Sequence, residues 1–446
     1  MLQTLRNAWK VEEIRKKILF TLLIVLLYRL GNAIPVPYVN VGLLQNYFDT
    51  VQNTVLGLLD VMSGGAFSTA TIFALSIQPY INASIIIQLL CIAIPALERL
   101  SKDEGEEGRK KIASITRYAT VGIGLLQGFG YYMLIKNNNF LVSYAQNNIW
   151  AAIVIILTFT SGSALIMWLG EQITEYGIGN GISMILFASI ISRLPTSVIT
   201  SIRNISTGSL EWWVALLVFL GALAIIVLIV YVNDAERRIP VQYAKRVVGR
   251  KMYGGQSTNI PLKANANGFM PLIFAMTIIQ IPVMIIQIVD GNGLATMQEF
   301  MQDPTTSIEG VGWFTKFYTQ YLASGTVIYY IIYALLIVAF AYFYTSISFN
   351  PIEISKNLQQ NGGFIPGIRP GRPTGEYLGK ISNRLTLFGA FFLMVIAIVP
   401  TVVLGAFGLT SAFGPTSLLI MVSVALETSA QLETMMLMRH YKGFLG

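Results

Sequence analysis

The sequence has very few of the side chains on which most enzymes and metal sites depend. Its 446 residues contain one cysteine, Cys91, and one histidine, His440. A single cysteine excludes an intramolecular disulfide and a cysteine-based metal cluster. A single histidine in the C-terminal tail excludes a histidine-based metal site and disfavours a Ser-His-Asp triad. We therefore expect neither a bound cofactor nor a catalytic centre.

Motifs for phosphate binding and acid–base chemistry are equally scarce. The Gly-Ile-Gly-Asn-Gly run at 177–181 follows no predicted strand and lacks a lysine, so it fits a turn that opens the next helix. Glu171 and Glu175 stand at helical spacing beside this turn, where they fit solvated or capping carboxylates. Glu427 is the one acidic residue that we place inside an apolar segment away from its ends. We expect it to make a structural hydrogen bond.

Charged residues are also few. They make up 12% of the chain, whereas 54% of its residues are hydrophobic, and the mean hydropathy is +0.62. This balance is typical of a polytopic helical membrane protein. The first apolar run lacks a small-residue cleavage site, so we expect it to remain as a membrane span. The predicted fold class is all-α, with ten transmembrane helices near residues 17–34, 71–94, 112–135, 149–169, 179–201, 212–232, 268–289, 324–347, 380–402 and 416–436.

The basic residues are distributed unevenly between the predicted loops. Of the 30 lysine and arginine residues, all but five lie in the terminal segments or in the loops after spans 2, 6 and 8, with the first turns of spans 3 and 9. The five others are Arg29, Lys136, Arg193, Arg203 and Lys316. Because lysine and arginine accumulate in cytoplasmic loops, both termini are predicted to face the cytoplasm. The net charge of +8 therefore indicates topology, not nucleic-acid binding.

The ten spans divide into two halves of five, residues 1–206 and 207–446. An odd number of spans in each half makes the halves oppositely oriented, which is an inverted repeat. Spans 2 and 7 correspond in this arrangement, and both are interrupted: span 2 contains Pro79, and span 7 contains Gln280 and Pro282. Matched interruptions indicate a functional path between the halves. Chance is the alternative, because proline and glycine are common in membrane helices.

A short apolar segment at 56–67 precedes span 2 and has about half the length needed to cross a bilayer. Span 2 itself, 71–94, carries Asn82, and Pro79 within it is expected to free the carbonyl of Leu75. Polar groups at membrane depth are tolerated only against protein or water. The short segment could therefore enter a polar path and block it. The alternative is a short loop helix beside a proline-kinked packing helix.

Two pairs of branched apolar residues share a helix face at a spacing of four. They are Ile77 with Ile81 on span 2, and Ile182 with Leu186 on span 5. Such residues usually face lipid or the protein core. If the two faces point at one another across a pore, their side chains could seal it by steric fit and dewetting.

Two long basic loops, 233–267 and 349–379, are predicted on the cytoplasmic side. Alternation from Glu236 onward predicts a strand or hairpin beside a basic tip at 249–251. The loops could serve only as orientation signals that also contact anionic lipids. Their length favours a docking platform for a soluble partner with an acidic surface.

Several runs of the sequence resemble the SecY family of bacterial protein-conducting channels, and the resemblance covers essentially the whole chain. The matching runs lie at 34–37, 62–66, 72–75, 79–81, 83–90, 167–175, 177–183, 256–258, 261–263, 366–371 and 384–387. The resemblance implies a clamshell of two inverted five-helix halves in the bacterial plasma membrane. It also implies SecE as a small partner at the back, SecG as a further subunit, and the SecA motor or a ribosome on the cytoplasmic side. Signal sequences and unfolded polypeptides are the implied substrates.

The family pattern implies roles for individual residues. A pore ring falls on Ile77, Ile81, Ile182, Leu186, Ile273 and Ile420. The plug at 56–67 includes Leu56, Leu58, Leu59, Val61, Met62, Gly64, Gly65 and Phe67. Partner docking falls on Arg250, Lys251, Arg369 and Arg372. Leu186 stands where isoleucine is typical, and Lys251 where a second arginine is often found, which disfavours bidentate recognition there.

The lateral gate of the family lies between spans 2–3 and 7–8. Asn82, Gln127 and Thr277 are polar residues on spans 2, 3 and 7, and we expect some of them to hydrogen-bond across the gate. The predicted function is a passive, gated conduit for unfolded polypeptide, driven by a partner. The alternative is an ion-coupled secondary transporter, which needs ionisable groups at the midplane, where Glu427 is the sole candidate.

Overall fold

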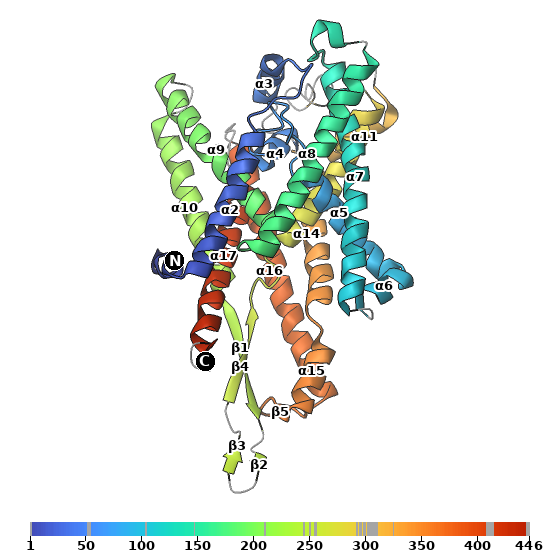
Figure 1. The fold of residues 1–446 in the computed structure, drawn as a ribbon. Helices are drawn as coiled ribbons and strands as arrows, with labels where there is room; N and C mark the ends of the chain where they lie inside the picture. The colour runs from blue at the N-terminus through green and yellow to red at the C-terminus, as the bar shows by residue number, and fades with distance from the viewer. Residues whose placement is uncertain are drawn as a thin grey trace.

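The structure is a computed structural model of the chain. It describes residues 2–50, 55–102, 105–146, 148–208, 211–243, 246–248, 251–253, 257–290, 293, 297, 300, 311–323, 325–406 and 414–442. Helices dominate these residues, and a slender β-structure projects from one end of the helical body (Figure 1).

In this described part, each of ten long helices overlaps one predicted span. They are α2 (Glu12–Gly31), α5 (Gln78–Ala93), α7 (Gly105–Asn137), α8 (Ile149–Tyr176), α9 (Gly181–Ser206), α10 (Trp212–Asp234), α11 (Met270–Val289), α14 (Val327–Ser348), α16 (Arg372–Ala406) and α17 (Pro415–Lys442). Six of them, α8, α9, α10, α14, α16 and α17, are long and apolar enough to cross a membrane. Shorter apolar helices occur in α5 and α11, the two spans predicted to be interrupted.

Short elements occupy the connections. The helices are α1 (Leu2–Lys10), α3 (Val41–Thr50), α4 (Val55–Met62), α6 (Pro95–Lys102), α13 (Trp313–Phe317) and α15 (Pro351–Gln360), with a 3-10 turn at Ser143–Ala145 and a π-helical turn at Tyr318–Leu322. The strands are β1 (Glu236–Tyr243), β2 (Arg246–Val248), β3 (Lys251–Tyr253), β4 (Ser257–Lys263) and β5 (Gly363–Phe364).

Span 2 begins later than its hydropathy predicts. Residues 71–77 form turns, and helix α5 starts only at Gln78. Pro79 therefore lies in the first helical turn, where its missing N–H costs nothing. The Leu75 carbonyl accepts the N–H of Gln78 at 3.3 Å, so the prediction that Pro79 leaves it free is wrong.

The turns at 71–77 are held against the first half by backbone contacts. The Ile72 N–H donates to the carbonyl of Ile34 at 3.0 Å. Its own carbonyl lies so close to α8 that a Cβ on Gly162 would be 1.8 Å from the oxygen. Only glycine permits this approach, and it fixes the entry of the chain into α5.

The glycine-rich run at 177–181 is a turn between α8 and α9, as predicted. The Asn180 side chain caps α9 by accepting the N–H groups of Ile182 and Ser183 at 3.0 and 3.4 Å. The Ile178 N–H donates to the hydroxyl of Thr21 at 3.0 Å, so the turn is also attached to α2.

The β-structure joins the two long basic loops. Strand β1 lies between β4 and β5, antiparallel to both, and β2 pairs with β3 at the far tip. The predicted hairpin is confirmed, and its pairing with the second loop was not foreseen. Ile239 and Val241 are the buried residues of β1, and they pack with Leu358 of α15 and Leu378 of α16.

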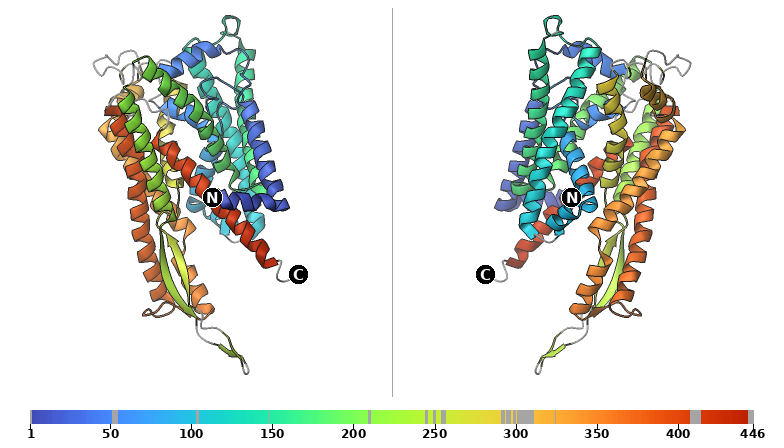
Figure 2. Two further views of the ribbon diagram at one scale, coloured as in Figure 1. Left: turned by 90° about the vertical axis from the view of Figure 1, so that its left-hand side faces the viewer. Right: turned by 90° about the vertical axis from the view of Figure 1, so that its right-hand side faces the viewer.

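Two large hydrophobic clusters hold the helices together. The first draws on both halves of the chain, from Ile24 on α2 to Ile420 on α17. The second includes residues of α3, α7 and α8, of the connections between helices in the first half, and Val283 and Ile286 of α11. Figure 2 shows the blue-to-cyan helices of the first half beside the orange helices of the second, with α17 crossing obliquely.

Candidate functional site

The six residues predicted to form a pore ring converge in the first hydrophobic cluster. They are Ile77 and Ile81 at the start of α5, Ile182 and Leu186 on α9, Ile273 on α11 and Ile420 on α17. Ile182 is partly buried against the cluster, and the other five are at most 6% exposed. Residues from both halves of the chain therefore contribute to one buried apolar cluster that includes all six positions.

The short apolar segment lies inside the molecule. Its helix α4 places Met62 in the cluster that contains the six converging residues. Leu56 and Leu59 pack in or against the second cluster, and Val61 is partly buried. Leu58 belongs to α4, and its side chain lies outside the described residues. The segment thus bridges the two clusters.

Aromatic contacts hold the end of this segment. The Phe67 ring stacks on Tyr131 of α7 with centroids 4.2 Å apart, and meets Phe48 of α3 edge-on at 5.3 Å. The Tyr131 hydroxyl also donates to the Phe67 carbonyl. Such ring pairs add to the free energy of apolar burial, so Phe67 is a firm anchor.

Two glycines let the backbone of the segment lie directly on α9. Gly64 and Gly65 have φ angles of 69° and 90°, in the region that favours glycine. A Cβ on Gly64 would lie 2.9 Å from the Ser192 hydroxyl oxygen, and one on Gly65 would lie 3.0 Å from the Arg193 guanidinium carbon. Larger side chains at either position would push the segment off α9.

Side chains of α2 bind the backbone of the same turn. The Tyr28 hydroxyl and the Asn32 amide donate to the Ser63 carbonyl at 3.1 and 3.3 Å. Arg29 donates to the Gly64 carbonyl at 3.2 Å. The segment therefore sits between α2 and α9, and we call these contacts its seat.

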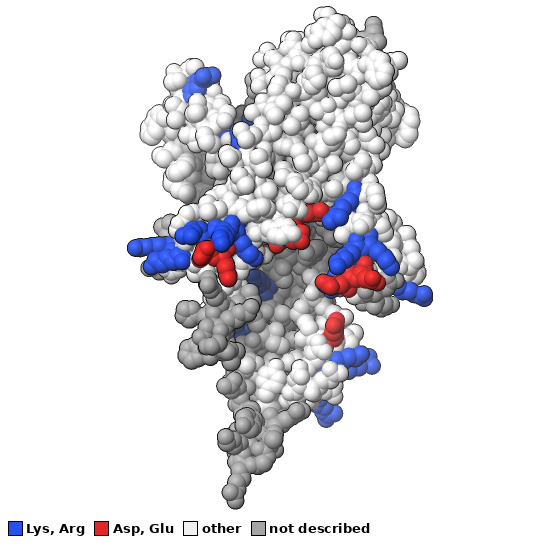
Figure 3. Space-filling model, in the orientation of Figure 1, with Lys and Arg blue, Asp and Glu red and all other residues white. Residues whose placement is uncertain are grey.

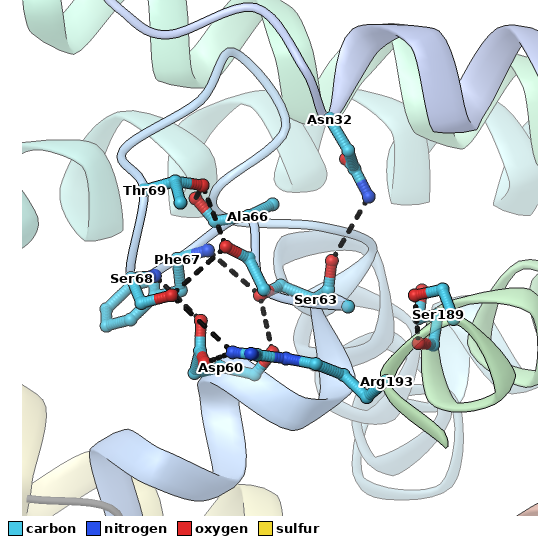
Figure 4. A network of polar contacts seen from close by, with 12 residues as sticks. Asn32, Asp60, Ser63, Ala66, Phe67, Ser68, Thr69, Ser189 and Arg193 are labelled. Atoms are coloured by element: carbon cyan, nitrogen blue, oxygen red, sulfur yellow. Dashed lines mark hydrogen bonds and ion pairs between the residues drawn. The ribbon is translucent and has the colours of Figure 1, made fainter. Parts of the chain in front are cut away.

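An ion pair that sequence reasoning missed completes the site. Asp60 on α4 is 7% exposed, and its carboxylate pairs with Arg193 of α9 and accepts the Ser68 N–H at 2.7 Å (Figure 4). A signal was present, because charged residues in apolar segments often mark functional positions. Asp60 interrupts an apolar run, and Arg193 is one of the few basic residues outside the predicted cytoplasmic segments.

The three predicted gate residues line one cavity of about 70 Å³ between α5, α7 and α11. Asn82 and Gln127 come from the first half, and Thr277 comes from the second. Gln78 and Gln280 join them on α5 and α11, and the seated segment closes one side through Leu59 and Phe67. The cavity is thus polar in part and lies where the two interrupted helices meet.

The predicted hydrogen bonds across this cavity are not made. Among the described residues, neither Asn82 nor Gln127 hydrogen-bonds to Thr277 or to the other. The Asn82 side-chain oxygen, the Gln78 side-chain oxygen and the Gln280 amide nitrogen are buried without a partner in the protein. The cavity has room for several water molecules, since one needs roughly 10–15 Å³. Direct hydrogen bonds were expected because unpaired polar groups are costly in hydrocarbon, yet these side chains do not bond to one another.

Two of the predicted docking residues, Arg369 and Arg372, lie in the stretch from strand β5 to the first turn of α16. Arg369 and Arg372 are exposed, and Arg372 pairs with Glu376 at 3.1 Å. Lys251 is in β3 with its side chain outside the described residues, and Arg250 lies outside them altogether. In Figure 3 the blue lysines and arginines gather around and below the lower end of the helical body, whose upper part is almost entirely white.

The acidic residues Glu171 and Glu427 differ in the contacts that they make. Glu171 forms an ion pair with Arg117 at 2.9 Å, which links α8 to α7. Glu427 on α17 is exposed and makes no hydrogen bond within the described part of the chain. The prediction of a structural hydrogen bond for Glu427 is therefore not supported.

Long apolar helices packed around one buried cluster, to which a short helix also contributes, are typical of a polytopic membrane protein. A sequence profile described as SecY matches residues 71–429. The chain belongs to the SecY family.

Relatives extend over the whole chain. It is 42% identical over 459 residues to "Protein translocase subunit SecY" of Streptomyces coelicolor, and the match covers 100% of both chains. Similar proteins with the same description occur in Thermotoga maritima, at 41% over 456 residues, and in Thermus thermophilus, at 42% over 458. Each of these two matches covers 100% of this chain and 98% of the relative.

Solved structures share the fold at lower identity. One described as "The structure of a protein conducting channel" has a TM-score of 0.64 at 18% identity and covers 94% of this chain and 92% of that one. Another, "Sec61 in the Canine ribosome-channel complex from the endoplasmic reticulum", has a TM-score of 0.59 at 17% identity with the same coverage. The chain is therefore a protein-translocation channel subunit in a membrane and not an enzyme, and the ion-coupled transporter is not supported.

Proposed function

We propose that unfolded polypeptide crosses this channel through a ring formed by Ile77, Ile81, Ile182, Leu186, Ile273 and Ile420, and that segment 56–67 is the plug that blocks the ring. The observation that carries this proposal is that all six residues belong to or pack against one buried apolar cluster, of which Met62 of the plug is also a member. Apolar constrictions exclude water and ions while they are narrow. The same side chains yield to a passing chain because dispersion contacts are individually weak.

We also propose that the cavity between α5, α7 and α11 is the closed lateral gate. A signal sequence that enters there would separate α5 from α11, and with them residues 1–206 from 207–446. The support is the polar lining, which includes Asn82, Gln127 and Thr277 from both halves. Few direct bonds need to break, because these side chains do not bond to one another. Energy for translocation comes from a partner.

The partners follow from two surfaces. Helix α10 buries only Ile229 and Val232, so nearly all of a very apolar helix is left for lipid or for a helical subunit such as SecE, with SecG as a further subunit. The sheet β4-β1-β5, its tip and Arg369 form a basic platform for the SecA motor or a ribosome. Two of the structurally similar proteins are described as ribosome-bound.

We infer that the chain lies in a bacterial plasma membrane with both termini in the cytoplasm. The termini lie toward the end of the molecule from which the β-structure projects (Figure 1). Basic residues gather there, as the positive-inside rule requires of cytoplasmic segments. Anionic lipids of the inner leaflet would contact the same band of charge.

Photocrosslinking tests the conduit. A photoreactive amino acid at Leu186 should react with a secretory polypeptide arrested during translocation. The same amino acid at Leu220 of α10, which is 51% exposed on the outer surface, should react with lipid or a neighbouring subunit. Equal yields of polypeptide adduct at the two positions would contradict the ring.

A further inference from the structure

The plug has one charged residue. Asp60 is the only acidic or basic side chain in segment 56–67, so its ion pair with Arg193 is the only one that the plug can make. The partner lies on α9, the helix that also carries Ile182 and Leu186 of the proposed ring. The contact therefore joins the plug to a wall of the pore.

Burial makes this contact sensitive to the loss of either partner. The side chains of Asp60 and Arg193 are only 10% and 26% exposed. When one member of a buried pair is removed, the other is left as an uncompensated charge in a poorly polarisable surrounding. Removal of both charges together is far better tolerated, because no charge then remains to be solvated.

The other polar contacts of the seat do not depend on plug side chains. Tyr28, Arg29 and Asn32 donate to backbone carbonyls of Ser63 and Gly64, which any sequence would offer. They hold the turn, but they do not distinguish one plug sequence from another. The position of α4 on α9 is specified by Asp60 alone among the polar plug side chains that contact this helix.

We propose that the Asp60–Arg193 ion pair is an electrostatic latch that holds the plug on α9. This inference rests on the plug role proposed above. When the plug moves into an aqueous cavity, both charges regain water, which offsets much of the lost attraction. The latch therefore sets where the plug sits without making its release prohibitive, and single neutralisation is more damaging than double neutralisation.

Ion conductance of the full-length channel, purified with its native partner subunits and inserted in planar bilayers, tests the latch. Asp60→Asn and Arg193→Gln should each raise the resting conductance about tenfold or more, because each breaks the ion pair that joins α4 to α9 and removes the opposite charge from the remaining member. The double variant Asp60→Leu with Arg193→Met should have a resting conductance close to that of the parent. Arg193→Lys keeps the charge and should also stay close to the parent. Arg203→Gln, at the exposed end of the same helix, is the matched control.

Thiol labelling gives a second readout that reports the plug itself. Ser63 is 1% exposed, and Cys91 is the only native cysteine. In a Cys91→Ser background, Ser63→Cys should be protected from a membrane-impermeant maleimide while the plug is seated. Either single neutralisation should speed labelling by about tenfold or more, and the double apolar variant should restore protection.

Two results would overturn the latch. Single variants that remain as tight and as protected as the parent would show that the charge pair does not hold the plug. A double variant as leaky as the singles would show that lost packing, not charge, is responsible. Deletion of 57–67 separates the two proposals. If the deletion variant leaks ions and the single variants do not, the plug proposal is supported and the latch proposal is contradicted. A deletion variant as tight as the parent contradicts both proposals.

Discussion

Asp60 is buried and Asn82 is partly buried with a buried side-chain oxygen, and only Asp60 is satisfied. The Asp60 carboxylate has an arginine and a backbone N–H as partners. The Asn82 oxygen is buried without a partner in the protein. A buried acceptor without a partner costs about 1–3 kcal/mol when water does not reach it. The proposed plug is thus held by a charge pair, whereas the described residues of the proposed gate make no hydrogen bond to one another.

Replacement of Asn82 by leucine should strengthen the closed gate. Leucine has a similar shape and removes the unsatisfied oxygen, so the closed state should gain about 1 kcal/mol. A more hydrophobic signal sequence would then be needed to open the channel. Export of a graded series of signal sequences should fall for the weakly hydrophobic members and stay unchanged for the strongest.

Gln88 provides the control for this change, because it is exposed on the same helix α5. Gln88→Leu should leave the export threshold where it is. If Asn82→Leu also leaves the threshold unchanged, or lowers it, the amide does not destabilise the closed gate.

The sequence predicts that the three gate residues lie near one another, but it does not predict which hydrogen bonds they make. Asn82, Gln127 and Thr277 are polar positions on spans that the inverted repeat and the family pattern place at one seam. Whether two amides meet depends on separations of less than an ångström, which no pattern encodes. The Asp60–Arg193 pair was missed for a different reason, since its members are 133 residues apart in the same half of the chain, one on the short segment and one on span 5.

Among the elements, α4 has the most distinctive position. It is short, yet it contributes to both large clusters, through Met62 on one side and Leu56 on the other. The turns at 71–77 follow α4 and leave it inside the molecule. The hydropathy of these residues predicts that they belong to span 2. Those turns are set by contacts with Ile34 and Gly162, which are distant in sequence, and local apolarity could not reveal them.

Deletion of 57–67 should leave a folded channel that leaks small ions. The long helices do not depend on the plug for their backbone hydrogen bonds, and the ring would lose the apolar surface that backs it. Conductance in planar bilayers measures the leak, and gel filtration with the partner subunits checks assembly.

A Gly-Ser segment of the same length in place of 57–67 separates two causes of the leak. It should leak as much as the deletion, because it restores chain length without apolar burial. If either variant is as tight as the parent, segment 56–67 is not the plug.

On the scale of the whole molecule, the two basic loops share one sheet. Gln242 and Tyr243 of β1 pair with Phe364 and Gly363 of β5, so loop 349–379 continues the hairpin of loop 233–267. The sequence predicted the hairpin from alternation and the platform from loop length. It could not predict that the loops share a sheet, because a two-residue strand such as β5 leaves no recognisable pattern.

Charge reversal on this platform should weaken binding of the cytosolic partner. Arg369→Glu should have the larger effect, several-fold in affinity, because Arg372 is already engaged with Glu376. A higher salt concentration should reduce the difference in binding affinity between variant and parent, since exposed charges are screened within about 10 Å at 0.1 M salt. Binding of SecA or ribosomes to the purified channel at two ionic strengths measures both effects.

Lys136→Glu is the matched reversal for this test, because Lys136 is exposed at the far end of α7, away from the sheet. It should leave partner binding as in the parent. If the Arg369→Glu variant binds the cytosolic partner as tightly as the parent does, the proposed docking platform is contradicted.

The sheet also has a mechanical meaning. Strand β1 follows α10, β4 leads toward α11, and β5 leads toward α16. The sheet therefore connects one end of each of these three long helices through hydrogen-bonded strands. Antiparallel strands resist sliding, because every cross-strand bond would have to break together. A load applied to this sheet would therefore be shared by these helices, and we expect the second half to turn as a single lever. The width of the opening would then be set by the angle of that lever, not by the bending of any one helix.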